Sequence, residues 1–261
     1  MTKGIRYKND YLTEVIFKIN FSNILKLSGN KKEAAEEFQK EIFEEFPNVE
    51  FQYNNNVNVQ LDIKKGKSQT TIDDGDLTWI FSDETNLKHV ELNSNTLVLV
   101  YHKSAYEGFK EFLTDVSLLL NALRWYAPFN ILFLGLRYIN RIPEDVIDDN
   151  NIHEYINKSL ISDIIFDLDD DEGVSQLFSR LDLLNEDYQL TFQYGFFNPD
   201  YPNPYSKKGF ILDFDCKWRK IDSVNSQVAI EESLKRMNKI IYKKFEYSIT
   251  DKLKELMDVV E

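Results

Sequence analysis

Long segments of this chain alternate apolar and polar residues, and this period of two limits its fold more than any other feature. The alternation runs through Leu12–Phe21, 57–63, Tyr188–Phe197 and 210–221. Residues two apart lie on the same face of a strand, so one face of each segment is apolar and the other is polar. We therefore predict half-buried strands, which is the pattern of antiparallel sheets with one covered face.

Other segments repeat apolar residues every three to four positions, which predicts amphipathic helices. The three long ones are 31–46, 106–125 and 227–259. Pro47 and Pro128 end the first two, because proline disfavours helical conformation in the residue before it. We expect two shorter helices at 151–160 and 174–182.

The order of these elements defines the fold class that we expect. Residues 49–103 resemble a β-meander, and 130–142 form a further strand. The prediction is an α+β fold in which antiparallel sheets are gripped by long helices. Residues 1–127 and 128–261 run in a similar order, β-α-β(n)-α, so they are predicted to be two pseudo-symmetric halves. They can form one compact domain, and one continuous sheet is an equal alternative.

Charge and cysteine content limit the classes of partner. The chain has 44 acidic and 31 basic residues and a formal net charge of −13. Such a surface repels phosphate, so nucleic acid is expected only through a partner protein. One cysteine excludes an internal disulfide framework. No apolar signal core or membrane-spanning run is found, so we expect a cytoplasmic protein and no membrane partner.

Signatures of catalysis are missing from the sequence. It contains no glycine-rich phosphate loop and no GxSxG elbow. His89, His102 and His153 lack the spacing of metal ligands. Cys216 lies on an apolar strand face, where a buried, inert thiol is expected. We assign no catalytic residue, metal or cofactor, and we favour a non-enzymatic protein.

The segment 130–142 is the most informative polar feature. It carries Arg137 and Arg141 on one strand face and Asn140 on the other. Buried arginine is costly unless a carboxylate pairs with it. We expect a structural network of Arg137 and Arg141 with the carboxylates of Glu14, Asp213 and Asp215. The alternative is a site for an anionic ligand, such as a nucleotide, or for an acidic residue of a partner.

Paired carboxylates offer a third possibility. Asp213 and Asp215 share a strand face and, with Glu14, could bind a divalent cation in a metal-dependent hydrolase. We rank this below a solvated or salt-bridged face, because no matching lysine motif follows. The acidic runs 73–76 and 167–172 are expected to be solvated turns.

Several short motifs resemble a sporadically distributed bacterial family of unknown function. They lie at 11–16, 79–82, 106–109, 136–142, 212–215 and 245–250, and the most specific is Leu-Arg-Tyr-Ile-Asn-Arg-Ile at 136–142. The resemblance brings no known activity. A patchy distribution implies an accessory gene of the kind found in phage-defence or toxin–antitoxin modules, with a partner encoded nearby.

These observations favour a protein-interaction or regulatory subunit. The segment 196–205 is rich in aromatic, proline and asparagine residues, so it can form a contact loop. We expect Phe197, Tyr201 and Tyr205 to anchor this interface. The alternatives are the small-ligand module and, last, the hydrolase.

Overall fold

A computed structural model describes most of the 261 residues. The described ranges are 6–8, 10–28, 32–53, 56–62, 67–73, 77–124, 129–148, 151–162, 174–198, 209–224 and 226–260. Tyr201, Tyr205 and the acidic run 167–172 therefore lie outside the described residues, as does most of the run 73–76.

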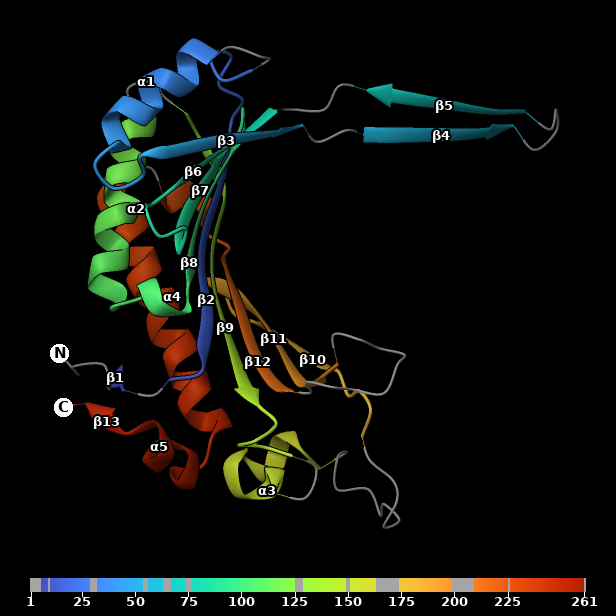
Figure 1. Cartoon of the computed structure of the whole chain (residues 1–261), viewed down its shortest axis with the longest axis vertical. Coiled ribbons are helices and arrows are strands. Elements are labelled where there is room, and N and C mark those ends of the chain that lie inside the picture. The colour runs from blue at the N-terminus through green and yellow to red at the C-terminus, as the bar shows by residue number, and fades with distance from the viewer. Residues whose placement is uncertain are drawn as a thin grey trace. The chain divides into compact units, whose positions relative to one another are not determined.

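A large antiparallel sheet dominates the described part of the chain (Figure 1). Its nine strands follow the order β10-β11-β12-β9-β2-β8-β7-β6-β3. They are β2 (Leu12–Phe21), β3 (Asn48–Tyr53), β6 (Leu77–Ser82), β7 (Lys88–Leu92), β8 (Thr96–His102), β9 (Ile131–Pro143), β10 (Ser179–Leu184), β11 (Tyr188–Phe197) and β12 (Gly209–Trp218). The smaller pairs are β1 (Arg6–Tyr7) with β13 (Val259–Val260) and β4 (Asn56–Asp62) with β5 (Lys67–Asp73).

Five α-helices accompany these strands in the described ranges. They are α1 (Lys32–Ile42), α2 (Phe109–Arg124), α3 (Ile152–Tyr155), α4 (Gln227–Ser248) and α5 (Asp251–Met257). Short 3₁₀ turns lie at η1 (Lys103–Ala105), η2 (Lys158–Leu160) and η3 (Ile221–Ser223). The fold is thus α+β with an antiparallel sheet, as the alternating segments predict. None of the helices in these ranges is both long enough and apolar enough to span a membrane.

The chain divides into two compact units. Unit 1 comprises Met1–Val15, Gly135–Lys220 and Ile230–Glu261. Unit 2 comprises Ile16–Leu134 and Ile221–Ala229.

In unit 2, helices α1 and α2 cover one face of the strands. The ring of Phe38 on α1 lies 5.3 Å from that of Phe81 on β6, and Phe112 on α2 lies 5.2 Å from Tyr101 on β8. The apolar alternate residues of β2 are buried in the same unit, and Phe17 and Phe21 are 0% and 1% exposed. The helix faces predicted from the period of three to four are the faces that are buried.

In unit 1, helix α4 packs on strands β9 and β12. The rings of Phe192 and Phe214 stack at 4.5 Å, and Phe245 of α4 meets Phe214 edge-on at 6.4 Å. Tyr138 on β9 donates a hydrogen bond of 2.9 Å to the side chain of Asn238 on α4. The opposite face of these strands carries the polar residues described below.

The helix predicted at 174–182 is wrong. Residues Ser179–Leu184 form strand β10, which pairs with β11 in antiparallel register. The local sequence around Leu181 and Leu183 is compatible with a helix or a strand. These residues pair with Phe192 and Leu190 of β11, and this pairing stabilises the strand. Tertiary pairing has overridden local pattern here.

The single helix predicted at 227–259 is also wrong, because it is interrupted after Ser248. Ile249 forms a β-bridge with Ile156, and Thr250 caps the new helix α5 by accepting a hydrogen bond from the backbone N–H of Leu253. The apolar spacing continues across this break, so the sequence period did not reveal it. A threonine at an N-cap is the local signal for the new start.

Candidate functional site

Arg137 and Asp213 form the centre of the polar strand face in unit 1. Arg137 donates from Nε to Oδ1 of Asp213 at 2.8 Å and from Nη2 to Oδ2 at 2.6 Å. The Asp213 side chain is 8% exposed, whereas that of Arg137 is 41% exposed. The hydrogen bonds to Asp213 raise the pKa of the guanidinium. This two-pronged geometry is the strongest form of an arginine–carboxylate pair, and it supplies the buried carboxylate with its partner.

Asp215 extends the network on the neighbouring register position. It lies opposite Arg137 in the pairing of β12 with β9, and Lys217 lies 3.7 Å from its carboxylate. Burial raises the pKa of Asp215, although the charges of Lys217 and Arg137 act in the opposite sense. The negative charge of Glu14 also raises the pKa of Arg137. The structure therefore brings Glu14, Arg137, Asp213 and Asp215 together.

Arg141 contacts an aromatic ring on the same strand face. Its guanidinium lies over the ring of Phe197, 5.5 Å from the centroid. Gly209 lies close to Arg141, because a Cβ there would be 3.2 Å from Nε of Arg141 and 3.1 Å from the backbone oxygen of Ile142. The predicted network residue Arg141 and the predicted interface residue Phe197 are thus neighbours.

The outer part of this face carries a second ion pair. Arg180 and Asp182, both on β10, are joined by a bond of 2.9 Å from Nε to Oδ2. Thr191 on β11 donates a hydrogen bond of 2.6 Å to the same carboxylate. These bonds lower the pKa of Asp182. Both charged side chains remain exposed to solvent.

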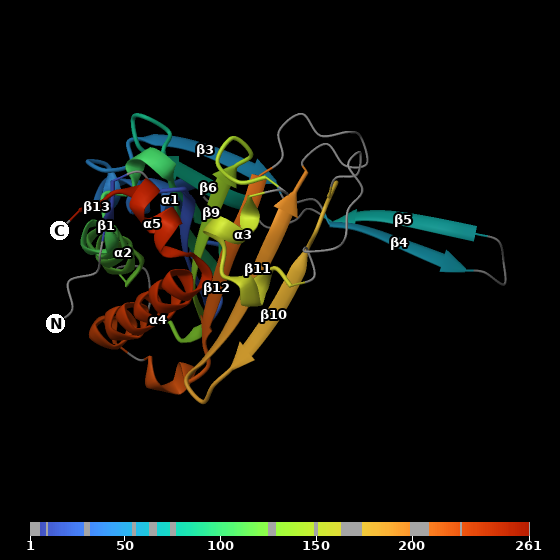
Figure 2. The same ribbon diagram turned by 90° about the horizontal axis from the view of Figure 1, so that it is seen from below.

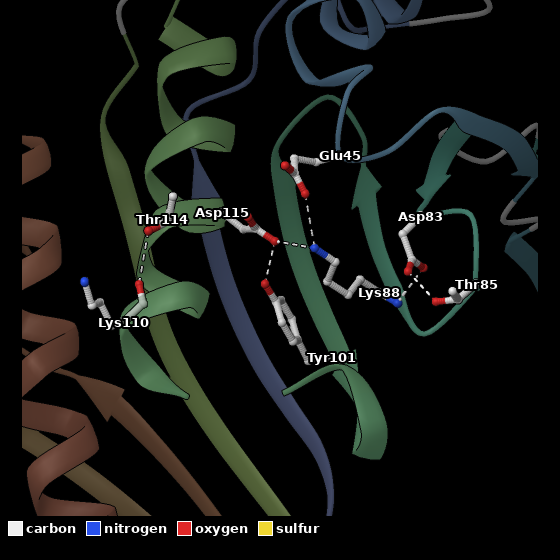
Figure 3. A network of polar contacts seen from close by, with 8 residues as sticks. All are labelled: Glu45, Asp83, Thr85, Lys88, Tyr101, Lys110, Thr114 and Asp115. Carbon is white, nitrogen blue, oxygen red and sulfur yellow. Dashed lines mark hydrogen bonds and ion pairs between the residues drawn. The ribbon is translucent and has the colours of Figure 1, made fainter. Parts of the chain in front are cut away.

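A buried network in unit 2 was missed by sequence reasoning (Figure 3). Asp115 of α2 accepts a hydrogen bond of 2.5 Å from the hydroxyl of Tyr101 and one of 3.1 Å from Nζ of Lys88. Lys88 also lies 3.4 Å from Glu45 and 5.5 Å from the ring centroids of Phe46 and Tyr101. The signal for this network was a single acid, Asp115, on the apolar face of the predicted helix.

The environment of this network raises the pKa of two of its members, Tyr101 and Lys88. Burial and the bond to Asp115 raise the pKa of Tyr101 far above its ordinary value. The pKa of Lys88 is raised as well: burial opposes this, but the charges of Asp115 and Glu45 outweigh it. The network therefore holds a neutral tyrosine and a charged lysine over a wide pH range. It ties α2 to β7 and β8.

The structure also places the single cysteine, Cys216, and two of the histidines, His89 and His102. Cys216 is buried, and burial raises its pKa to about 12. The rings of His89 and His102 lie 5.4 Å apart, an approach that their sequence positions did not predict. Within the described ranges, no group of three or more His, Cys, Asp or Glu side chains is placed to hold a metal ion.

Exposed aromatic side chains gather on β3, the last strand in the sheet order. All six residues of β3 are exposed. Phe51 lies 5.8 Å from the rings of both Tyr53 and Trp79, and Val49 occupies the same strand face. A shallow open depression is found elsewhere, on α1, lined by Glu36, Gln39, Lys40 and Phe43. Of these surfaces, the strand face of β3 has the composition of an interface.

Comparison with models of protein families finds no match for this sequence, and comparison with curated proteins finds none either.

Proposed function

We propose that this chain is a non-enzymatic protein-interaction subunit that binds its partner along strand β3. The observation that carries this proposal is the exposed row Val49, Phe51 and Tyr53 on the last strand of the sheet order. Soluble proteins rarely leave adjacent aromatic residues on an open edge strand. An interaction partner that covers this row would cover both the apolar surface and the outer edge of β3, which pairs with no second strand among the described residues.

The geometry of β3 supports a particular chemistry for the proposed partner. An extended segment that pairs with β3 would present apolar residues at alternate positions, toward Phe51 and its neighbours. Glu50 lies on the other strand face, so a basic residue at the intervening position would complement it. The net charge of −13 would speed the approach of a basic partner. We therefore expect a basic protein with an exposed or disordered strand-forming segment.

The proposed biological setting rests on the resemblance of the sequence motifs to a sporadically distributed bacterial family. A sporadically distributed accessory gene suits a cytoplasmic regulatory or inhibitory subunit of a phage-defence or toxin–antitoxin module. In such modules the partner is encoded nearby. The paired state of Arg137 supports an interaction role over anion binding, because Asp213 engages two of its donor atoms.

We also infer that the fold arose from two topologically equivalent halves gripped by long helices. In the sheet order, β2 is followed by β8, β7, β6 and β3, and β9 is followed in the other direction by β12, β11 and β10. In each set, the strand that comes first in the chain lies beside the strand that comes last. The remaining strands then follow in reverse chain order. A long helix, α2 or α4, follows each set in the chain. This shared order supports the inference.

Affinity purification from the native host tests the proposed function. We expect the wild-type chain to recover a stoichiometric partner that the Phe51→Glu variant loses. Val228→Glu is the matched control, because Val228 is an exposed apolar residue on α4. A partner retained by Phe51→Glu, or no stoichiometric partner with the wild type, would contradict the proposal.

A further inference from the structure

Strand β10 and the residue before it expose large apolar side chains at the other end of the sheet order. In the described sheet β10 pairs with β11 and has no strand on its other side (Figure 2). Phe178, Leu181 and Leu184 are 61%, 44% and 69% exposed. Natural edge strands are usually blunted by charged side chains, above all lysine, or by proline or a bulge. The segment 178–184 contains neither lysine nor proline, and its two charged residues, Arg180 and Asp182, have opposite signs, so β10 is suited to pair with a further strand whose charges complement them.

The hydrogen bonds of β10 show which backbone groups point away from β11. Leu177 donates to Phe196 at 3.1 Å, and Asn185 donates to Tyr188 at 2.9 Å. These bonds bracket the strand, and both come from odd-numbered residues. Backbone groups alternate in direction along an antiparallel strand. The N–H and C=O groups of residues 178, 180, 182 and 184 therefore point outward.

The sequence of this segment complements itself when a second copy runs antiparallel to it. With Leu181 opposite Leu181 of the second copy, Arg180 faces Asp182 and Asp182 faces Arg180. Phe178 then faces Leu184, and Leu184 faces Phe178. We propose that the protein forms a two-fold symmetric homodimer by antiparallel pairing of β10 with β10, centred on Leu181. This inference is independent of the proposed partner at β3.

Charge and hydrogen bonding select this register over its neighbours. The outward-pointing N–H and C=O groups of one copy must bond to those of the other copy, and these groups belong to even-numbered residues. The register can therefore shift only in steps that keep even-numbered residues opposite even-numbered residues. A shift in one direction places Arg180 opposite Arg180, and the opposite shift places Asp182 opposite Asp182. Like charges directly opposite each other destabilise a strand pair, whereas opposite charges stabilise it. The register centred on Leu181 is the one that pairs unlike charges.

The ion pair already present in one chain does not oppose dimerisation strongly. Arg180 and Asp182 are both exposed, and exposed pairs contribute little to stability. In the dimer each would gain a partner across the strands, while Asp182 can keep its bond from Thr191. The paired strands are short, six residues each. Interfaces below about 1,200 Å² are typical of weak or transient complexes, so we expect a micromolar dissociation constant.

Sedimentation of the full chain across a concentration series tests the dimer. We expect the wild type to shift from monomer to dimer over the micromolar range. Arg180→Asp places like charges opposite each other twice, and should weaken the dimer at least about tenfold. Adding Asp182→Arg to the same chain restores unlike pairs and should restore the dimer. Arg236→Asp, an exposed change on α4 with the same effect on net charge, is the control and should dimerise normally.

Disulfide trapping tests the register. Leu181 and its copy would form a non-hydrogen-bonded pair with Cα atoms about 4.5 Å apart, close enough for a disulfide. Leu181→Cys should therefore cross-link under mild oxidation, whereas Leu184→Cys, about 20 Å from its copy, should not. The buried Cys216 does not compete. The proposal would be overturned by a wild type that stays monomeric. It would also be overturned by a dimer that Arg180→Asp does not weaken and that Leu181→Cys does not cross-link.

Discussion

Arg137 donates two hydrogen bonds to the carboxylate of Asp213, one of 2.8 Å and one of 2.6 Å, although 75 residues lie between them in the chain. The two partners differ in exposure, because the carboxylate is buried and the guanidinium is half-exposed. Removing one partner therefore has a different consequence from removing the other. The carboxylate would be left without a counter-charge in the sheet, whereas the guanidinium can turn to water.

We predict that Arg137→Met lowers the free energy of unfolding by about 3 kcal/mol, because it leaves a buried carboxylate unpaired. Asp213→Asn should cost less, about 1–2 kcal/mol, since the amide still accepts a hydrogen bond and the arginine reaches solvent. Urea unfolding of both variants measures the difference. Arg236→Met, at an exposed position on α4, should leave the midpoint close to that of the wild type. Equal losses in Arg137→Met and Asp213→Asn would contradict the asymmetry.

Asp215 is expected to make the stability of the folded protein depend on pH. Its pKa is raised by burial, so the folded state holds the proton more tightly than the unfolded state does. Stability from this group is therefore greatest at low pH and falls as pH rises from the unfolded pKa, about 3.9, through the raised folded value. Asp215→Asn removes this penalty. We expect the variant to melt at a higher temperature than the wild type at pH 7, with the gap closing as pH falls toward 4.

The control for that experiment is Asp182→Asn, because the pKa of Asp182 is lowered in the fold. Its substitution should have the opposite effect on the pH profile, with a loss at pH 7 that diminishes in acid. Parallel profiles for the two variants would show that burial of Asp215 does not control the pH response.

The sequence predicted the sheet well where the apolar alternation was long. Strand β2 and strand β11 have the bounds that the alternation of Val15, Phe17 and Ile19, or of Leu190 and Phe192, indicates. The sequence failed at β10, where the apolar spacing around Leu181 and Leu183 suits either a helix or a strand and pairing with β11 decides the conformation.

The sequence was enough to predict which residues belong to the candidate site, but not the distances between them. Buried arginines on a strand face require carboxylate partners, so the sequence was enough to indicate Arg137 and Asp213 as members of one network. Their distance could not be derived, because the register of β9 with β12 depends on packing across the whole sheet. The Lys88–Asp115 network escaped prediction because its members come from separate elements. Asp115 on an apolar helix face indicated a buried acid, but nothing in the sequence pointed to Lys88 and Tyr101 as its partners.

The hydroxyl of Tyr101 is expected to stabilise unit 2 in a pH-dependent manner. Tyr101→Phe removes one hydrogen bond to the buried Asp115, which should lower the free energy of unfolding by about 1–2 kcal/mol at pH 7. The raised pKa values of Tyr101 and Lys88 mean that both groups stabilise the fold below their unfolded pKa values. This stability is lost as pH rises above about 10.

The wild type should therefore lose stability steeply in alkali, and Tyr101→Phe should show a shallower slope. Thermal melts between pH 8 and 11 measure both slopes. Tyr247→Phe is the control, since Tyr247 is exposed on α4, and we expect it to keep the wild-type profile. A Tyr101→Phe slope as steep as that of the wild type would show that other groups control alkaline unfolding.

Gly195 on β11 is predicted to be the least replaceable glycine described. Its φ is +144°, and a Cβ there would lie 2.1 Å from the backbone oxygen of Leu177. That backbone is fixed, because Leu177 donates a hydrogen bond to Phe196. Gly195→Ala must displace the segment that leads into β10, and should cost about 3 kcal/mol or more.

Gly108 provides a matched comparison for this substitution. Its φ is +155°, but a Cβ there would meet the flexible end of the Glu111 side chain at 3.2 Å. Gly108→Ala therefore carries backbone strain without a backbone clash, and should cost about 1–2 kcal/mol. Urea unfolding compares the two variants, and hydrogen exchange should show faster opening of residues 177–184 in Gly195→Ala alone. Equal costs, or unchanged exchange in β10, would mean that close approach of Leu177 is not what requires glycine at position 195.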